Sequence, residues 1–255
     1  MAQPAPVAHP ALTTVRARAL FTPLDAGGRA GTVTRRLAKA IRLGLLLDGE
    51  RLPAESDLAA QLGVSTVTLR EALAALRTMG LVETRRGRAG GSFVRAPADD
   101  HHPGRLERPL RLLSVHEITD IGDHRAAIAG AAAWLAAERA LPADVAALTE
   151  HAGRLPAAGA VTDRRRADAR LHIEIAAAAQ SPRLTREEMD LWSEVGDLVW
   201  LPMTERDVTR ASREHAALIG AIEAGDAPLA RQIAQQHVAA ETQRLLTLRL
   251  RPPRP

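Results

Sequence analysis

Three histidines and one aspartate in the C-terminal half of the chain could together hold a metal ion. Asp168 and His172 are four residues apart, so both side chains would lie on one face of a helix. His215 and His237 follow on two later segments with helical periodicity, and all four fall on sides that also carry apolar residues. Three imidazoles and a carboxylate suit one divalent transition metal per chain, Zn, Ni, Mn or Fe, without choosing among them.

The alternative is that these residues are ordinary polar side chains. A single histidine is more often a hydrogen-bonded core or surface residue than a ligand. His151 is expected to be of that kind, contributing neither to a metal site nor to stability. Four unpaired buried polar groups would be costly, however, and one shared metal ion would satisfy them together. The spacing alone leaves both interpretations open.

Arg125 lies within the apolar stripe of a long helix that begins after the capping box Ser114-x-x-Glu117. A guanidinium on a buried face is costly unless an opposite charge meets it. One interpretation is structural: an internal ion pair, for example with Asp168, or a side chain that reaches the edge of the helix. The other is functional, because a planar guanidinium can hold the carboxylate of a small-molecule effector through two hydrogen bonds.

Near the N-terminus, residues 30–95 have the pattern of a winged helix-turn-helix. Residues 30–97 carry 11 basic and 6 acidic side chains, whereas residues 98–255 carry 20 basic and 23 acidic ones. A basic segment joined to a mildly acidic one suggests a nucleic-acid-binding module attached to a second domain. The expected elements are three helices and two short strands, at Thr34–Leu47, Ala54–Leu62, Ser65 to about Met79, Leu81–Thr84 and Ser92–Val94.

The third of these helices is expected to lie in the major groove of DNA and to contact bases with its first residues. Val67 and Leu69 are expected to pack against the other helices. The alternative is a solvent-exposed amphipathic helix in a protein that binds no DNA, and the basic hairpin that follows argues against it. The candidate DNA contacts come from the helix and the hairpin: Ser65, Thr66, Thr68, Arg70, Arg86, Gly87 and Arg88.

The chain as a whole is predicted to be mostly α-helical, with the small β-wing of the first domain followed by an all-α bundle of about six helices over residues 109–250. Residues 1–29 are expected to be a disordered arm, 96–108 a linker and 251–255 a tail. The helices of the bundle are predicted at Ser114–Ala140, Pro142–Leu155, Thr162–Ala179, Pro182–Leu201, Glu205–Glu223 and Ala227–Leu248.

The composition excludes several classes of protein. The chain has no cysteine, which excludes disulfides, thiolate zinc fingers, iron–sulfur clusters and cysteine nucleophiles. No apolar run approaches the roughly 20 residues that span a bilayer, and the N-terminus has no secretory signal. A cytoplasmic protein without membrane contact is expected.

The N-terminal segment resembles the GntR family of bacterial transcription regulators, whose pattern it follows in order and spacing at Leu52–Ala59, Leu62–Ser65, Leu69–Leu73, Gly80–Val82, Gly87–Arg88 and Gly90–Val94. The resemblance implies a homodimer that binds a palindromic double-stranded operator and senses a ligand with its second domain. Ser56 and Thr66 stand where the family usually has arginine, so base readout is expected to depend more on Arg70 and the wing.

The six helices that follow resemble the ligand-binding FCD domain of the FadR subfamily. Its metal-binding members use an Asp-x-x-x-His pair and two further histidines, which match Asp168, His172, His215 and His237 by order and helix. The resemblance also implies an effector-binding arginine at Arg125. Two positions depart from the common pattern, with Ala129 in place of a frequent glutamate and Ser181 in place of a frequent asparagine.

The leading hypothesis is therefore a transcription regulator, a repressor as in most of the family, whose operator binding responds to a small organic acid held beside a metal ion. A rival is a metal-dependent enzyme fused to a DNA-binding domain, but no separate general base or nucleophile stands out. A third hypothesis keeps the regulator without the metal, and the acid then binds the imidazolium groups directly.

Overall fold

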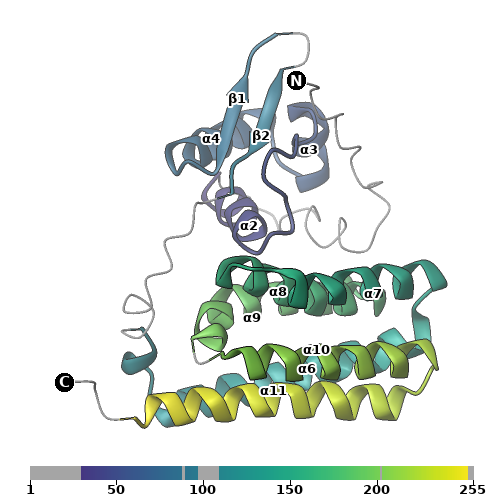
Figure 1. The fold of residues 1–255 in the computed structure, drawn as a ribbon. Coiled ribbons are helices and arrows are strands. Elements are labelled where there is room, and N and C mark those ends of the chain that lie inside the picture. The colour runs from purple at the N-terminus through teal and green to yellow at the C-terminus, as the bar shows by residue number, and fades with distance from the viewer. Residues whose placement is uncertain (1–29, 88–89, 97–108, 202, 252–255) are drawn as a thin grey trace. The chain divides into compact units, whose positions relative to one another are not determined.

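The computed structural model describes residues 30–87, 90–96, 109–201 and 203–251 (Figure 1). The chain divides into two compact units, residues 1–98 and 99–255. The described residues are mostly helical and contain one two-stranded sheet, which confirms the predicted fold class. The predicted arm 1–29, all but one residue of the linker 96–108 and all but one residue of the tail 251–255 lie outside the described residues.

Three helices form the core of the first unit: α2 (Ala30–Arg42), α3 (Glu55–Leu62) and α4 (Thr66–Thr78). Ser65 caps α4, because its Oγ accepts a hydrogen bond from the backbone amide of Thr68. Gly63, in the left-handed conformation, ends α3 two residues earlier and makes the tight turn between the two helices. The side chains that fill the core are fully buried leucines and one isoleucine: Leu37, Ile41, Leu58, Leu62, Leu69, Leu73 and Leu76.

The first helix differs from its predicted extent of Thr34–Leu47. It begins at Ala30 and ends at Arg42, because Gly44 adopts a left-handed conformation with φ of 71°. The amide of Leu45 then bonds the carbonyl oxygen of Ala40 and closes the end of the helix. The expected stop at Asp48 and Gly49 was wrong, since the buried Leu43, Leu45 and Leu46 lie in turns after the helix and not in the helix itself.

Strands β1 (Val82–Arg85) and β2 (Gly91–Val94) form the antiparallel hairpin, with Val82 opposite Val94 and Arg85 opposite Gly91. An isolated bridge from Arg51 to Phe93, not foreseen from the sequence, ties the segment before α3 to the hairpin. Gly90 is required at the turn, because a Cβ there would lie 2.5 Å from the carbonyl oxygen of Arg85.

The second unit consists mainly of six helices, within one to two residues of the predicted bounds: α6 (Val115–Arg139), α7 (Pro142–Ala157), α8 (Val161–Ala178), α9 (Pro182–Trp200), α10 (Glu205–Glu223) and α11 (Ala227–Arg249). The predicted capping box of Ser114 and Glu117 opens α6. In Figure 1, α7, α8 and α9 form one layer and α6, α10 and α11 the other. Among the described residues no helix is long and apolar enough to cross a membrane.

Helices α6 and α11 lie side by side along most of their length, and glycines allow the close approach (Figure 1). A Cβ on Gly122 would lie 2.5 Å from Cγ2 of Thr242, and one on Gly130 would lie 2.8 Å from the side chain of Gln235. The Thr242 side chain cannot easily move, because its Oγ1 donates a hydrogen bond to the carbonyl oxygen of Val238. The spacing of α6 and α11 therefore depends on these two glycines.

We expect Gly122→Ala to destabilise the helical unit by about 1–3 kcal/mol, because the added methyl group overpacks the contact with Thr242. The matched control is Gly153→Ala in α7, where nothing lies within 4 Å of the added Cβ and the lower unfolded-state entropy should stabilise slightly. Denaturant unfolding of the two variants measures the difference. Equal stability of both variants would show that the α6–α11 contact tolerates a side chain.

Candidate metal centre

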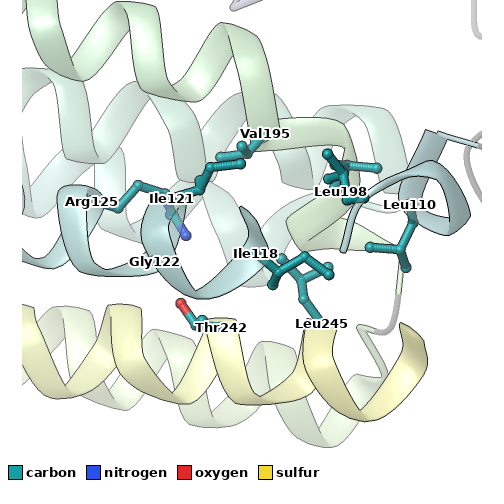
Figure 2. Close-up of a pocket in the computed structure, with 10 residues that line it drawn as sticks. Leu110, Ile118, Ile121, Gly122, Arg125, Val195, Leu198, Thr242 and Leu245 are labelled. Atoms are coloured by element: carbon teal, nitrogen blue, oxygen red, sulfur yellow. The ribbon is translucent and has the colours of Figure 1, made fainter. Parts of the chain in front are cut away.

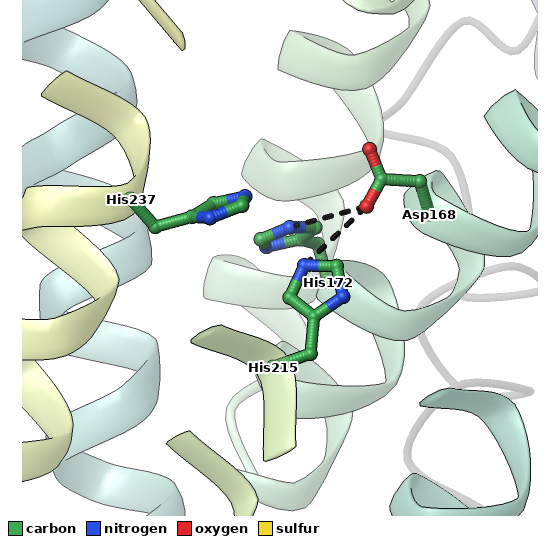
Figure 3. Close-up of side chains that lie close together, drawn as sticks. All are labelled: Asp168, His172, His215 and His237. Carbon is green, nitrogen blue, oxygen red and sulfur yellow. Dashed lines mark ion pairs between the residues drawn. The ribbon is translucent and has the colours of Figure 1, made fainter. Parts of the chain in front are cut away.

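Asp168 and His172 from α8, His215 from α10 and His237 from α11 converge inside the helical unit (Figure 3). All four are buried, and one ligand atom from each lies within 4.8 Å of those of the others. Oδ1 of Asp168 is 3.4 Å from Nε2 of His215 and 3.8 Å from Nε2 of His172. The structure thus brings together the four residues that the sequence singled out, from three helices far apart along the chain.

The atoms that face one another in this cluster have no hydrogen-bond partner among the described residues. They are Oδ1 of Asp168, Nε2 of His172, both ring nitrogens of His215 and Nε2 of His237. Buried polar atoms are almost always paired, so five unpaired atoms at one place point to a missing partner. A divalent cation accepts lone pairs from several such atoms at once, and the donor set of imidazoles and one carboxylate is chemically suited to it.

The opposite atoms of the same side chains are held by neighbouring residues. Nε1 of Trp200 donates a hydrogen bond to Oδ2 of Asp168 at 2.9 Å, and Nδ1 of His237 lies 2.5 Å from Oε2 of Glu214. Such outer contacts fix the orientation and tautomer of ligands in metal sites. They leave Oδ1 of Asp168 and Nε2 of His237 directed at the cluster. Neither supporting residue was predicted, because each comes from another helix and has no spacing relation to its partner.

Burial keeps two of the imidazoles in the form that can bind a metal ion. It lowers the pKa of His172 to about 3, and the charge of His237 adds to the effect. Burial likewise lowers the pKa of His215 well below its usual value, again with help from His237. Both rings are therefore neutral near pH 7, with a lone pair available.

The other two members of the cluster hold protons near neutral pH. Burial alone would lower the pKa of His237, but the carboxylates of Glu241 and Glu214 outweigh it and raise the pKa to about 10. Burial also raises the pKa of Asp168 to about 7, and the charge of Glu241 contributes. A cation that entered this cluster would have to displace these protons.

Arg125 is buried, with 4% of its surface exposed, and it has an ion pair. Its Nη2 donates to Oε2 of Glu241 in α11 at 2.8 Å, and its guanidinium lies 5.2 Å from the centre of the Trp192 ring. The pairing suggested from the sequence, with Asp168, was wrong: the partner is Glu241. The sequence carries a signal for Glu241, because this residue lies one helical turn after His237 on the same face.

Arg125 also lines a narrow pocket between α6, α9 and α11 (Figure 2). Figure 2 shows the arginine at one end of the pocket and Leu110 at the other. Apart from Arg125 and Thr242, the lining is apolar or glycine: Leu110, Leu113, Ile118, Ile121, Gly122, Val195, Leu198 and Leu245.

His151 lies in α7 and is not part of the cluster, as expected. The expectation that it has no role in stability does not fit its environment, however. It is 8% exposed, and its Nε2 lies 3.8 Å from a carboxylate oxygen of Glu174. A substitution there would remove buried contacts, so His151 is a poor control for stability measurements. The exposed His116 in α6 is a better one.

The predicted DNA contacts lie on the first unit, and most are accessible. Ser65, Thr66 and Arg70 are exposed at the start of α4, and Thr68 is half-buried because it packs beside the cap. Nε of Arg70 donates to Oε2 of Glu55 at 2.7 Å, which holds the arginine beside the first residue of α3.

One residue of α4 does not lie where the sequence analysis put it. Val67 was expected to pack inward, but it is 62% exposed, because it precedes the buried Leu69 by two residues and so faces away from the core. In the hairpin, Arg86 and Gly87 are exposed, whereas Arg88 lies outside the described residues.

Comparison with known proteins matches both halves of the chain to family models. Residues 29–94 match the bacterial regulatory proteins of the gntR family, and residues 120–240 match the FCD domain. The HTH-type transcriptional regulator RmpR of Mycobacterium gastri is 42% identical over 225 residues, covering 87% of this chain and 82% of the relative. This chain belongs to the GntR family.

The chain is also similar to a second regulator and to a solved structure. The L-lactate dehydrogenase operon regulatory protein of Escherichia coli K12 is 33% identical over 207 residues, covering 75% of this GntR-family chain and 76% of the relative. The solved structure of E. coli McbR/YncC has a TM-score of 0.46 and 22% identity, over 84% of this chain and 97% of that one. The family models and the relatives are those of transcription regulators and not of enzymes, so the chain is a DNA-binding transcription regulator.

Proposed function

We propose that this GntR-family protein is a homodimeric repressor that holds one divalent transition metal per chain and releases a palindromic operator when a small carboxylic acid binds beside the metal. The observation that carries the proposal is the buried cluster of Asp168, His172, His215 and His237, whose facing atoms lack hydrogen-bond partners. Asp168 and the three histidines would hold the ion. When bound, the metal would supply a positive charge that attracts the carboxylate of the effector.

The position of Arg125 supports a carboxylic acid as the effector. Its buried guanidinium lies on α6, and through Glu241 it is linked to His237, because the two oxygens of Glu241 face these two residues. The carboxylate of an acid bound beside Arg125 could accept two parallel hydrogen bonds from the planar guanidinium. A relative named for an L-lactate dehydrogenase operon agrees with an organic acid as the signal.

Arg70 is the residue that we expect to contribute most to operator sequence readout. A bidentate arginine–guanine contact is worth roughly 1–3 kcal/mol of discrimination, so Arg70→Ala should weaken specific binding about tenfold or more. Binding to unrelated DNA should persist, because phosphate contacts supply it. Fluorescence anisotropy with operator and scrambled duplexes measures both, and Arg77→Ala near the far end of α4 serves as the control. Unchanged operator affinity of the Arg70 variant would show that α4 reads DNA through other residues.

The wing is expected to act mainly on the phosphate backbone. Arg86→Ala should weaken operator and unrelated DNA by a similar factor and reduce the slope of log affinity against log salt by about one unit. A loss confined to the operator would instead mean that Arg86 contacts bases.

Metal content tests the cluster directly. Protein purified without chelator should carry about one transition metal per chain by elemental analysis. His172→Ala and His237→Ala should lose most of it, whereas His116→Ala, at an exposed site of α6, should keep it. Less than half an equivalent in wild-type protein after reconstitution with Zn, Ni and Mn would favour the metal-free hypothesis.

The protonation of the cluster also fixes the pH dependence of metal binding. The pKa of His237 is about 10, so at pH 6–8 each ion bound must release the proton of that ring. Asp168, with a pKa of about 7, releases a second proton at the acidic end of this range. Metal affinity should therefore rise about tenfold or more per pH unit between pH 6 and 8. Competition with a chromophoric chelator measures it, and a pH-independent affinity would contradict the assignment.

Arg125→Lys separates the two roles considered for this residue. Lysine keeps the charge and can still pair with Glu241, but it lacks the planar fork that holds a carboxylate at two points. If Arg125 binds the effector, the variant should keep its metal and its melting temperature nearly intact while small carboxylic acids no longer release DNA. The exposed Arg154→Lys in α7 is the control. Release of DNA at wild-type acid concentrations would make Arg125 a purely structural residue.

A further inference from the structure

Glu241 is a buried carboxylate to which neither the sequence analysis nor the proposed function gives a role of its own. Its side chain is fully shielded from solvent in α11. Oε2 accepts the hydrogen bond of Arg125 at 2.8 Å, whereas Oε1 has no hydrogen-bond partner among the described residues. Oε2 is thus held by a hydrogen bond, whereas Oε1 has only longer ion-pair contacts, 3.4 Å to Nε2 of His237 and 4.0 Å to Nη2 of Arg244.

The unsatisfied oxygen faces the metal cluster. Oε1 of Glu241 lies 3.4 Å from Nε2 of His237, the ring atom that Glu214 leaves unpaired. The same distance separates Oδ1 of Asp168 from Nε2 of His215, two atoms of the assigned ligand set. While His237 keeps its proton, this contact is an ion pair. Once a cation has displaced that proton, Oε1 and Nε2 would be placed as neighbouring ligands of one ion are.

Position along α11 explains how one helix can supply both groups. Glu241 follows His237 by four residues, so the two side chains stack on the same face. Asp168 and His172 have the same relation on α8. If Glu241 is added to the four residues of the cluster, the ligands consist of two such pairs, each with one carboxylate and one imidazole, and of His215 from α10.

We propose that Glu241 is a fifth metal ligand, which coordinates the ion through Oε1 while Oε2 stays bonded to Arg125. This inference rests on the metal site of the proposed function and adds a carboxylate to it. It also links the two sites chemically, because a carboxylate that binds Arg125 competes with Oε2 of Glu241 and so disturbs the group that holds the ion. Effector binding would then change the metal coordination itself.

Glu241→Gln tests the proposal with little change of volume. The glutamine carbonyl can still accept the hydrogen bond of Arg125, which turns the amide NH₂ toward the cluster, and an NH₂ group has no lone pair to offer a metal. Metal affinity, measured by chelator competition, should fall by about tenfold or more. The visible absorption of the Co²⁺-loaded protein should also change, because its bands report the number and type of ligands.

Glu188→Gln is the matched control. Glu188 is a second buried carboxyl group of the helical unit, whose Oε1 accepts a hydrogen bond from Nε1 of Trp192 at 3.0 Å. Its replacement removes an acidic group from the same protein interior without touching a proposed ligand. We expect the Co²⁺ spectrum and the metal affinity of this variant to match those of wild-type protein.

The double variant Arg125→Met/Glu241→Gln distinguishes coordination from simple charge balance, and it removes both partners of the buried pair if the single variant folds poorly. If Glu241 only neutralises Arg125, the double variant should recover wild-type metal affinity. If Glu241 is a ligand, affinity stays low and the altered spectrum persists. Recovery in the double variant, or a wild-type spectrum and affinity in Glu241→Gln, would overturn the inference. Failure of wild-type protein to bind metal would instead overturn the proposed function.

Discussion

The fold of the helical unit buries several ionisable groups, and its stability depends on opposite charges and hydrogen bonds that offset their loss of water. Arg125, Asp168, His237 and Glu241 are each buried, and they come from three helices, α6, α8 and α11. Helix α10 adds the buried His215 to the same region. An isolated buried charge is costly, and removing one partner of a buried pair leaves the other uncompensated. The helices that carry these groups are therefore held in register by electrostatics as well as by the apolar core around them.

The charges of this interior do not balance through ion pairs alone. Arg125 donates a hydrogen bond to one oxygen of Glu241, and His237 keeps a proton because the carboxylates of Glu241 and Glu214 lie beside it. Asp168 has a pKa of about 7, and among the described residues its one hydrogen-bond donor is Trp200. Without a metal, the protonated ring of His237 thus supplies the positive charge of the cluster. A divalent ion that replaced this proton would also accept lone pairs from Asp168 and from the two neutral imidazoles. The types of donor atom in the cluster and the protons that they hold therefore both support the proposed divalent metal ion.

Much of this arrangement could be predicted because it is encoded at short range. Asp168 and His172 are one helical turn apart, and the capping signals at Ser65 and Ser114 each depend on three or four residues. Apolar periodicity predicted that each of the four polar residues lies on the buried face of its helix, and the resemblance to the FCD domain implied that they form one ligand set. The same reasoning located the six helices of the second unit to within one or two residues.

The features that were missed depend on contacts between distant segments or on backbone conformation. Gly44 ends α2 because it adopts a positive φ, whereas Asp48 and Gly49 carry the more familiar stop signal. Val67, by contrast, could have been placed from spacing alone, because it precedes the buried Leu69 by two residues and so lies on the opposite face of α4. A buried Arg125 could be expected to have a counter-charge, but the sequence did not show which one. Glu241 is the partner because α6 packs closely against α11, an approach that Gly122 and Gly130 permit.

The Arg125–Glu241 pair bears on how a regulator of this kind would set its sensitivity. A buried guanidinium with no internal partner would bind the carboxylate of an effector without first giving up another contact, but burying such an unpaired charge costs free energy. A guanidinium already paired with Glu241 binds a carboxylate only by exchange, so the net gain is the difference between two similar contacts. On the proposed function, the internal carboxylate therefore lowers the affinity for the effector. In return it keeps the unliganded interior stable and makes the response depend on effectors that also have a second point of attachment, which the metal would provide.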